Sequence, residues 1–243
     1  LKPKAYENIT LAQVVAMVAE RLKLKVVGKI RQIPIQRITQ YQERDVEFLA
    51  RLAREYHHSF KIVGNQLVFT DKDELGQTEP VAVLDETQCI TIRLRDRIKD
   101  TAKQVEIKGF DTSGKKVVKK SKKASALRPK MKQAQAASGD TLKITTRGES
   151  QEQIDARGDA ALSEQNEDQS AGYITLIGNP KLVAGSTILL KNLGVFSGKY
   201  LIKQSRHSIS RSQGYITNIE VRMLEFIPDD LLTLGMEMTN ANT

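Results

Sequence analysis

Residues 41–70 constrain the fold most, because a helical period gives way there to a period of two within a few residues. Residues 44–56 carry apolar side chains at helical spacing, and the face predicted to point inward consists of Val46, Leu49, Ala50, Ala53 and Tyr56. Residues 60–69 alternate around Gly64 and Asn65, residue types that accept the positive φ of a tight turn. The stretch therefore predicts a helix followed directly by a β-hairpin.

An earlier helix is predicted from a capping box, in which Thr10 and Gln13 satisfy each other's backbone N–H groups. We expect this helix to continue to about Lys23, with an inward face formed by Leu11, Val14, Val15, Val18 and Leu22. Residues 25–27 are a strand candidate, and Pro34 belongs to an edge or a connector because proline cannot donate to a ladder. Two helices on a small sheet predict an α/β domain over residues 1–75.

From Pro80 the hydrophobic period is two, which is typical of strands with one buried face. Regular short strands with glycine-bearing turns predict a closed or nearly closed antiparallel, barrel-like sheet over residues 76–228, followed by a tail at 229–243. Within that domain, residues 150–168 carry only a thin apolar stripe and are expected to form a surface helix. The expected strands lie at 90–94, 105–107, 142–146, 173–177, 187–191, 200–209 and 216–226, and the fold class is α+β.

The net charge of +9 is concentrated between residues 115 and 132, where nine basic residues and no acid occur. The rest of the chain contains 29 basic and 29 acidic residues and is therefore neutral. Such a like-charge block repels itself, and we expect a basic flexible loop at about 111–141. The candidate contacts for a partner or a polyanion are Lys115, Lys116, Lys119, Lys120, Lys122, Lys123, Arg128, Lys130 and Lys132. The alternative is a solvated excursion between strands, favoured because no aromatic residue is interleaved to stack on bases.

Several classes of protein are disfavoured by composition. The single cysteine, Cys89, rules out an internal disulfide framework and fits folding in a reducing cytoplasm. No apolar run approaches the roughly 18 residues of a spanning helix, and no leader-like segment precedes the first element, so membrane insertion is not expected. Because the chain begins at Leu1 rather than methionine, we expect that an upstream portion has been removed or processed.

Catalytic chemistry has little support in the sequence. The adjacent His57 and His58 diverge by about 100° if they are helical, which prevents them from sharing a metal ion. His207, among serines in an alternating stretch, is interpreted as a hydrogen-bonded barrel residue rather than as a base for a nucleophile. Nucleophile elbows, zinc-binding helix motifs and phosphate-binding loops are missing from the sequence. We therefore predict no enzyme activity, no catalytic residue, no cofactor and no metal site.

Two groups of motifs resemble one known family. Residues 42–56, with Phe60 and residues 64–69, resemble a characteristic block of phage late control gene D proteins, the baseplate hubs of contractile tails. Related hub folds form the base of type VI secretion spike proteins. The last barrel strands of that family are similar to a second group of residues here, namely Gly178, Pro180, Leu182, Gly185, Phe196, Gly198, Tyr200, His207, Gly214 and Tyr215.

The resemblance implies a structural role in a tail. Hubs of that family are homotrimers in which each subunit supplies two barrel-like domains, so that the ring adapts a six-fold tail tube to a trimeric spike. Residues 1–73 would be the domain inserted beside these barrels, residues 80–226 would be one tube barrel, and the first barrel would lie upstream of Leu1. The implied partners are the trimeric spike and the tail tube and baseplate proteins. The implied location is the virion tail baseplate of a phage, prophage or other injection particle, assembled in the bacterial host cytoplasm.

Two alternatives to the hub remain at this stage. A basic nucleic-acid-binding module predicts tight, steeply salt-dependent DNA binding that maps to residues 115–132, whereas the hub predicts no specific nucleic acid. A tail-associated peptidoglycan hydrolase requires paired carboxylates, which one sequence does not identify. The neutral body of the chain is suitable for ring closure, because uniformly charged protomers would repel each other.

Overall fold

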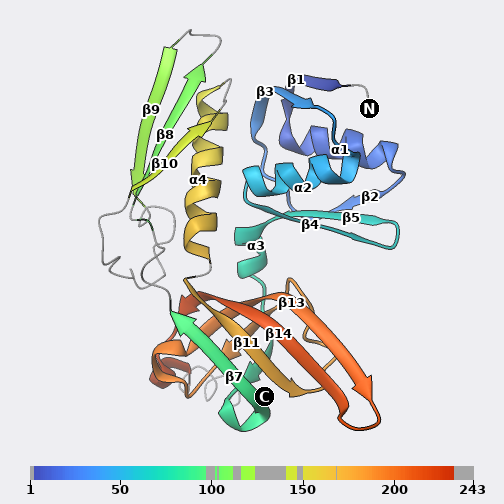
Figure 1. Cartoon of the computed structure of the whole chain (residues 1–243), viewed down its shortest axis with the longest axis vertical. Coiled ribbons are helices and arrows are strands. Elements are labelled where there is room, and N and C mark those ends of the chain that lie inside the picture. The colour runs from blue at the N-terminus through green and yellow to red at the C-terminus, as the bar shows by residue number, and fades with distance from the viewer. Residues whose placement is uncertain are drawn as a thin grey trace, which may run out of the picture. The chain divides into compact units, whose positions relative to one another are not determined.

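The computed structural model describes residues 3–96, 102, 104–111, 116–123, 141–146, 150–167 and 169–232 (Figure 1). Its class is α+β, as predicted. The chain forms two compact units that are interleaved along the sequence. The first unit contains residues 1–74, 102–127 and 139–165, and the second contains residues 75–101, 128–138 and 166–243.

The N-terminal part of the first unit is two helices with two small sheets (Figure 1). Helix α1 (Leu11–Arg21) begins at the predicted Thr10 and Gln13 capping box, which is present. Helix α2 (Asp45–Glu55) leads into the predicted hairpin, and Gly64 at its turn has a φ of 58°. The strands are β1 (Lys4–Thr10) paired with β3 (Pro34–Gln40), and β2 (Lys25–Val27), β5 (Gln66–Asp71) and β4 (His58–Val63) in the order β2-β5-β4.

The inward faces of the two helices differ in how well the sequence predicts them. The apolar face of α1 is buried as expected. In α2 the predicted face is partly wrong, since Val46 is 43% exposed whereas Phe48 and Leu52 are fully buried. Leu49, Ala53 and Tyr56 are buried as predicted. The buried face also includes Phe48, whose ring stacks on that of Tyr6 with centroids 5.5 Å apart. The sequence also did not predict β1 and β3, whose antiparallel pairing is entirely non-local.

The rest of the first unit is a helix on a three-stranded sheet (Figure 1). Strand β8 (Gln104–Asp111) lies in the centre, with β9 (Lys116–Lys123) antiparallel and β10 (Thr141–Thr146) parallel to it. The expected loop over 111–141 is therefore wrong for residues 116–123. There the ladder with β8 satisfies backbone groups that a loop would leave to water.

Helix α4 (Gln151–Glu167) is not the surface helix that the sequence predicted. Ile154 and Leu162 are buried in a cluster with Val105 and Ile107 of the sheet. On another side, Ala156 packs against the core of α1 and α2. Because the helix is covered on two sides, its apolar residues do not form a single stripe.

The second unit is a curled six-stranded sheet in the order β6-β12-β13-β14-β11-β7 (Figure 1). Neighbouring strands are antiparallel, except that β6 and β12 are parallel, and the edge strands β6 and β7 do not pair among the described strands. The core inside the curl includes Ile174, Ile188, Tyr200, Ile202 and Val221. The bounds are β6 (Pro80–Leu84), β7 (Cys89–Asp96), β11 (Ser170–Ile177), β12 (Thr187–Leu190), β13 (Gly198–Ser210) and β14 (Gly214–Phe226), and the short helix α3 (Lys72–Gly76) precedes them.

Candidate assembly and anion-contact surfaces

The basic run predicted from the sequence is placed in part on strand β9. Lys116, Lys119, Lys120, Lys122 and Lys123 belong to that strand, and Lys115, Arg128, Lys130 and Lys132 lie outside the described residues. Strand β9 stands at an edge of its sheet, and the side chain of Lys119 is exposed there. Part of the predicted contact therefore lies on a β-strand rather than in a loop.

The register of the three strands brings further lysines to the same face. Lys119 of β9 is opposite Lys108 of β8, and Lys108 is opposite Thr145 of β10. In the next row, Ser121 of β9 and Lys143 of β10 lie on either side of Glu106. Residues that are opposite each other in the register share a face, so Lys108, Lys119 and Lys143 are exposed on the same face of the sheet. The sequence analysis missed Lys108 and Lys143. The signal was available in the sequence, because alternate residues of a strand point to opposite faces, so that inward-facing Val105 and Ile107 imply an outward-facing Lys108.

A groove of about 400 Å³ between α2, β10 and α4 is lined by Arg51, Arg54 and Arg157 together with Glu55 and Glu164. Glu55 accepts hydrogen bonds from Arg51 at 2.9 Å and from Arg157 at 2.7 Å, and Arg51 also donates to Glu43 at 2.6 Å. Burial acts to lower the pKa of Arg51, but the hydrogen bonds to Glu43 and Glu55 prevail and raise it above its usual value. These residues are engaged in joining α2 to α4.

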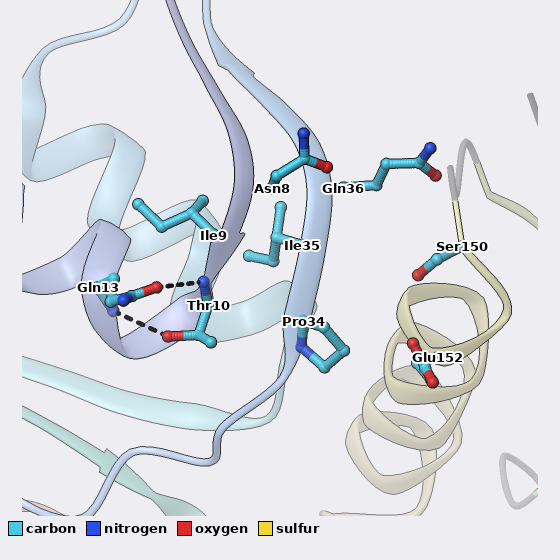
Figure 2. A pocket seen from close by; sticks show the side chains of 9 residues that line it. All are labelled: Asn8, Ile9, Thr10, Gln13, Pro34, Ile35, Gln36, Ser150 and Glu152. Carbon is cyan, nitrogen blue, oxygen red and sulfur yellow. Dashed lines mark hydrogen bonds between the residues drawn. The ribbon is translucent and has the colours of Figure 1, made fainter. Parts of the chain in front are cut away.

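A second groove, of about 350 Å³, lies between the ends of β1 and β3 and the start of α4 (Figure 2). Thr10 and Gln13 are bonded to each other there, the backbone N–H of Thr10 donating to Gln13 Oε1 at 2.9 Å and that of Gln13 to Thr10 Oγ1 at 3.3 Å (Figure 2). The backbone N–H of Gln36 donates to Gln153 at 3.1 Å. The polar groups of this groove therefore serve the fold.

The paired histidines are packed as single structural residues. His58 Nδ1 donates to the carbonyl of Tyr56 at 2.7 Å, while Nε2 accepts from the backbone N–H of Arg31 at 3.2 Å, which assigns the neutral tautomer. Burial lowers the pKa of His58 to about 4. His57 instead lies 3.4 Å from Asp73. Among the described residues, no group of three or more His, Cys, Asp or Glu side chains is arranged to hold a metal ion.

His207 is part of a hydrogen-bond network in the curled sheet, as predicted. Its Nε2 lies 3.0 Å from Ser205 Oγ and its Nδ1 lies 2.9 Å from the hydroxyl of Tyr215. Ser205 donates its proton to the carbonyl of Leu182. A serine whose proton is held by a carbonyl is not arranged as a nucleophile beside its base, so the network fastens the turn at Leu182 to β13 and β14.

One edge of the curled sheet is exposed. Strand β12 pairs with β13 only over residues 198–201, whereas β14 accompanies β13 to Ser210. Residues 206–210 of β13 thus have no strand on their other side in the described part of the chain, and Figure 1 shows this hairpin extending from the sheet. Ile209 near its tip is 82% exposed, and Ile177 at the end of β11 is 72% exposed.

The sequence profile of the phage tail baseplate hub (GPD) family matches residues 2–213. This chain belongs to that family. The family is that of a structural component of phage tail baseplates. No curated protein sequence matches the hub chain significantly. Within the described residues, no helix combines the length and the apolar character that membrane crossing requires.

Solved structures agree with the hub fold. The 43 kDa tail protein of prophage MuSo2 from Shewanella oneidensis has 20% identity and a TM-score of 0.63, over 89% of this chain and 64% of that one. A tail protein from Neisseria meningitidis MC58 has 12% identity and a TM-score of 0.67, over 91% and 69%. The E. coli c3393 protein, a type VI secretion component described as similar to T4 tail proteins gp27 and gp5, has 15% identity and a TM-score of 0.52, over 93% and 50%. The hub chain thus spans less than two thirds of the length of the MuSo2 protein.

Proposed function

We propose that this chain is a non-enzymatic hub that adapts the six-fold tail tube to a trimeric spike, as a homotrimer in the baseplate of a contractile phage tail or a related injection particle. Residues 1–75 are then the inserted domain, and the curled sheet within residues 76–228 is the portion that contributes to the tube. The partners are the spike and the neighbouring tube and baseplate proteins, and assembly takes place in the host cytoplasm. Family membership and the shared tail-protein fold support this proposal.

The observation that carries the proposal is the exposed edge of β13. An edge strand presents unpaired N–H and C=O groups, and proteins normally cover or blunt such edges. Here residues 206–210 of the edge are exposed beside an apolar tip at Ile209. A ring of subunits supplies a cover for such an edge, because each copy offers its own edge or face to the next.

The test is the solution mass by light scattering, at two protein concentrations and at low and high salt. A trimer that persists at high salt is expected, because apolar and backbone contacts at the edge are not screened by ions. A hexamer would contradict the trimer and would indicate that six copies of the chain close a ring by themselves. A monomer under all conditions would contradict closure through the edges of this chain.

A further inference from the structure

The exposed face of the β10-β8-β9 sheet carries Lys108, Lys119 and Lys143 against one carboxylate, Glu106, so its described charge is net positive. Lys108 and Lys119 are directly opposite each other on neighbouring strands, and like charges in that position are destabilising. No ion pair joins Lys108, Lys119 or Lys143 to another described residue, although the half-buried Glu106 is directly opposite Lys143 in the register. A bound anion would remove the repulsion that the register creates.

The sheet holds these lysines on a firm platform. The opposite face of β8 is fully packed, because Val105 and Ile107 contact Ile154 and Leu162 of α4. Neighbouring strands lie about 4.8 Å apart and side chains on one face repeat every second residue, about 7 Å along a strand. The three ammonium groups therefore emerge from fixed points within about 12 Å of one another.

The composition of this face distinguishes between two classes of macromolecule. Protein interfaces are enriched in tyrosine, tryptophan and arginine and depleted in lysine and serine. Here the exposed side chains described are Lys108, Lys119 and Lys143, Ser121 and Thr145, and Val117. The lysines and the two hydroxyls are a set that contacts phosphate oxygens in nucleic-acid complexes. The exposed side chains described on these strands include no aromatic ring to stack on an unpaired base. The face fits the backbone of duplex DNA better than it fits an acidic protein or a single strand.

We propose that Lys108, Lys119 and Lys143 form a site on the outer face of this sheet that binds the phosphate backbone of duplex DNA without sequence preference. This goes beyond the structural role of the hub and does not depend on its trimeric state. Binding of this kind is weak, with a Kd of about 10⁻⁴ to 10⁻⁶ M at physiological salt, and it falls steeply as salt rises.

The test is fluorescence anisotropy with the full chain and two labelled duplexes of unrelated sequence, between about 50 and about 200 mM salt. The variant is Lys108→Gln/Lys119→Gln/Lys143→Gln. Its matched control removes the same charge from exposed lysines on other elements, as Lys25→Gln/Lys61→Gln/Lys181→Gln. The plot of log Kobs against log salt has a negative slope. Loss of three phosphate contacts is expected to make this slope less steep by about 3, while the control keeps the wild-type slope.

Two outcomes would overturn the proposal. One is an equal loss of affinity in both triple variants, which would mean that net charge alone attracts DNA. The other is displacement of the DNA by polyglutamate at equal charge concentration, which would mean that the partner is an acidic protein. If the variant does not fold, lysine acetylation of the wild type decides. DNA must then protect Lys108, Lys119 and Lys143 more than Lys25, Lys61 and Lys181, and equal protection would exclude the site.

Discussion

At the scale of single residues, His58 is held neutral by two backbone groups of opposite kind. Its Nδ1–H meets the carbonyl of Tyr56, and its Nε2 meets the N–H of Arg31. A proton on Nε2 would place two donors against each other, in a buried position that also disfavours charge. The pKa of about 4 is the consequence of that burial.

This residue predicts an acid-sensitive stability. The unfolded chain binds a proton near pH 6.5, whereas the folded chain binds it only near pH 4. The contribution of His58 to the free energy of unfolding is thus complete above pH 6.5. It falls by up to about 3 kcal/mol as the pH decreases from 6.5 to 4.

Urea unfolding across that pH range measures the effect. His58→Gln should lose less stability on acidification than wild type, because the variant has no proton to gain at this position. His207→Gln, in the other unit, is the matched control and should keep the wild-type loss. Parallel pH profiles for wild type and His58→Gln would contradict the assignment.

At the scale of elements, α4 approaches β8 closely because glycine stands at both points of contact. A Cβ on Gly158 would lie within van der Waals overlap of Ile107 Cδ1, and one on Gly109 would overlap Ile154 Cδ1. Neither glycine has a positive φ, so space rather than backbone conformation requires it.

Gly158→Ala is expected to destabilise the first unit by about 1–3 kcal/mol. This outcome opposes the gain of about 1 kcal/mol that alanine brings to a helix interior, because Ile107 is fully buried and cannot move aside freely. Chemical denaturation measures it. Adding Ile107→Val, which removes the overlapping methyl group, should restore part of the loss. A stabilised Gly158→Ala variant would show that the interface is looser than the contacts indicate.

Glu55 joins α2 to α4 by accepting from both Arg51 and Arg157. Glu55→Gln leaves two guanidinium groups beside a neutral amide and should cost about 1.5–3 kcal/mol, the range for hydrogen bonds to charged groups. Glu20→Gln on the exposed side of α1 is the control and should change stability by less than about 0.5 kcal/mol. Equal thermal stability of both variants would show that the hydrogen bonds of Glu55 to Arg51 and Arg157 do not stabilise the packing of α4.

At the scale of the whole molecule, the proposed trimer predicts a contact at the exposed apolar tip of the β13-β14 hairpin. Ile209→Lys should shift a trimer toward monomer in light scattering, because it places a charge where the proposed contact is apolar. Val27→Lys, on an exposed strand of the other unit, introduces the same charge and should leave the mass unchanged. A trimer that tolerates Ile209→Lys but not Val27→Lys would move the interface to the first unit.

The sequence by itself determined the features that neighbouring residues control. The start of α1, the hairpin at Gly64 and strands β7, β11, β12, β13 and β14 follow from capping, turn chemistry and a period of two. These are local, so one sequence contains all the information. The nine basic residues were also visible as a run. Strand β6 was not predicted, and the strands predicted at 105–107 and 142–146 belong to the first unit instead of the curled sheet.

Only the tertiary structure decided which segments meet. Contacts between residues far apart in the chain decide four features. These are the pairing of β1 with β3, the burial of Phe48 in α2 against Tyr6, the burial of α4, and the membership of α4 in the first unit. The same holds for the basic face, because Lys108 and Lys143 join Lys119 only through the register of three strands. Periodicity specifies which face of an element is apolar, but the partner that covers it is chosen by packing over the whole chain.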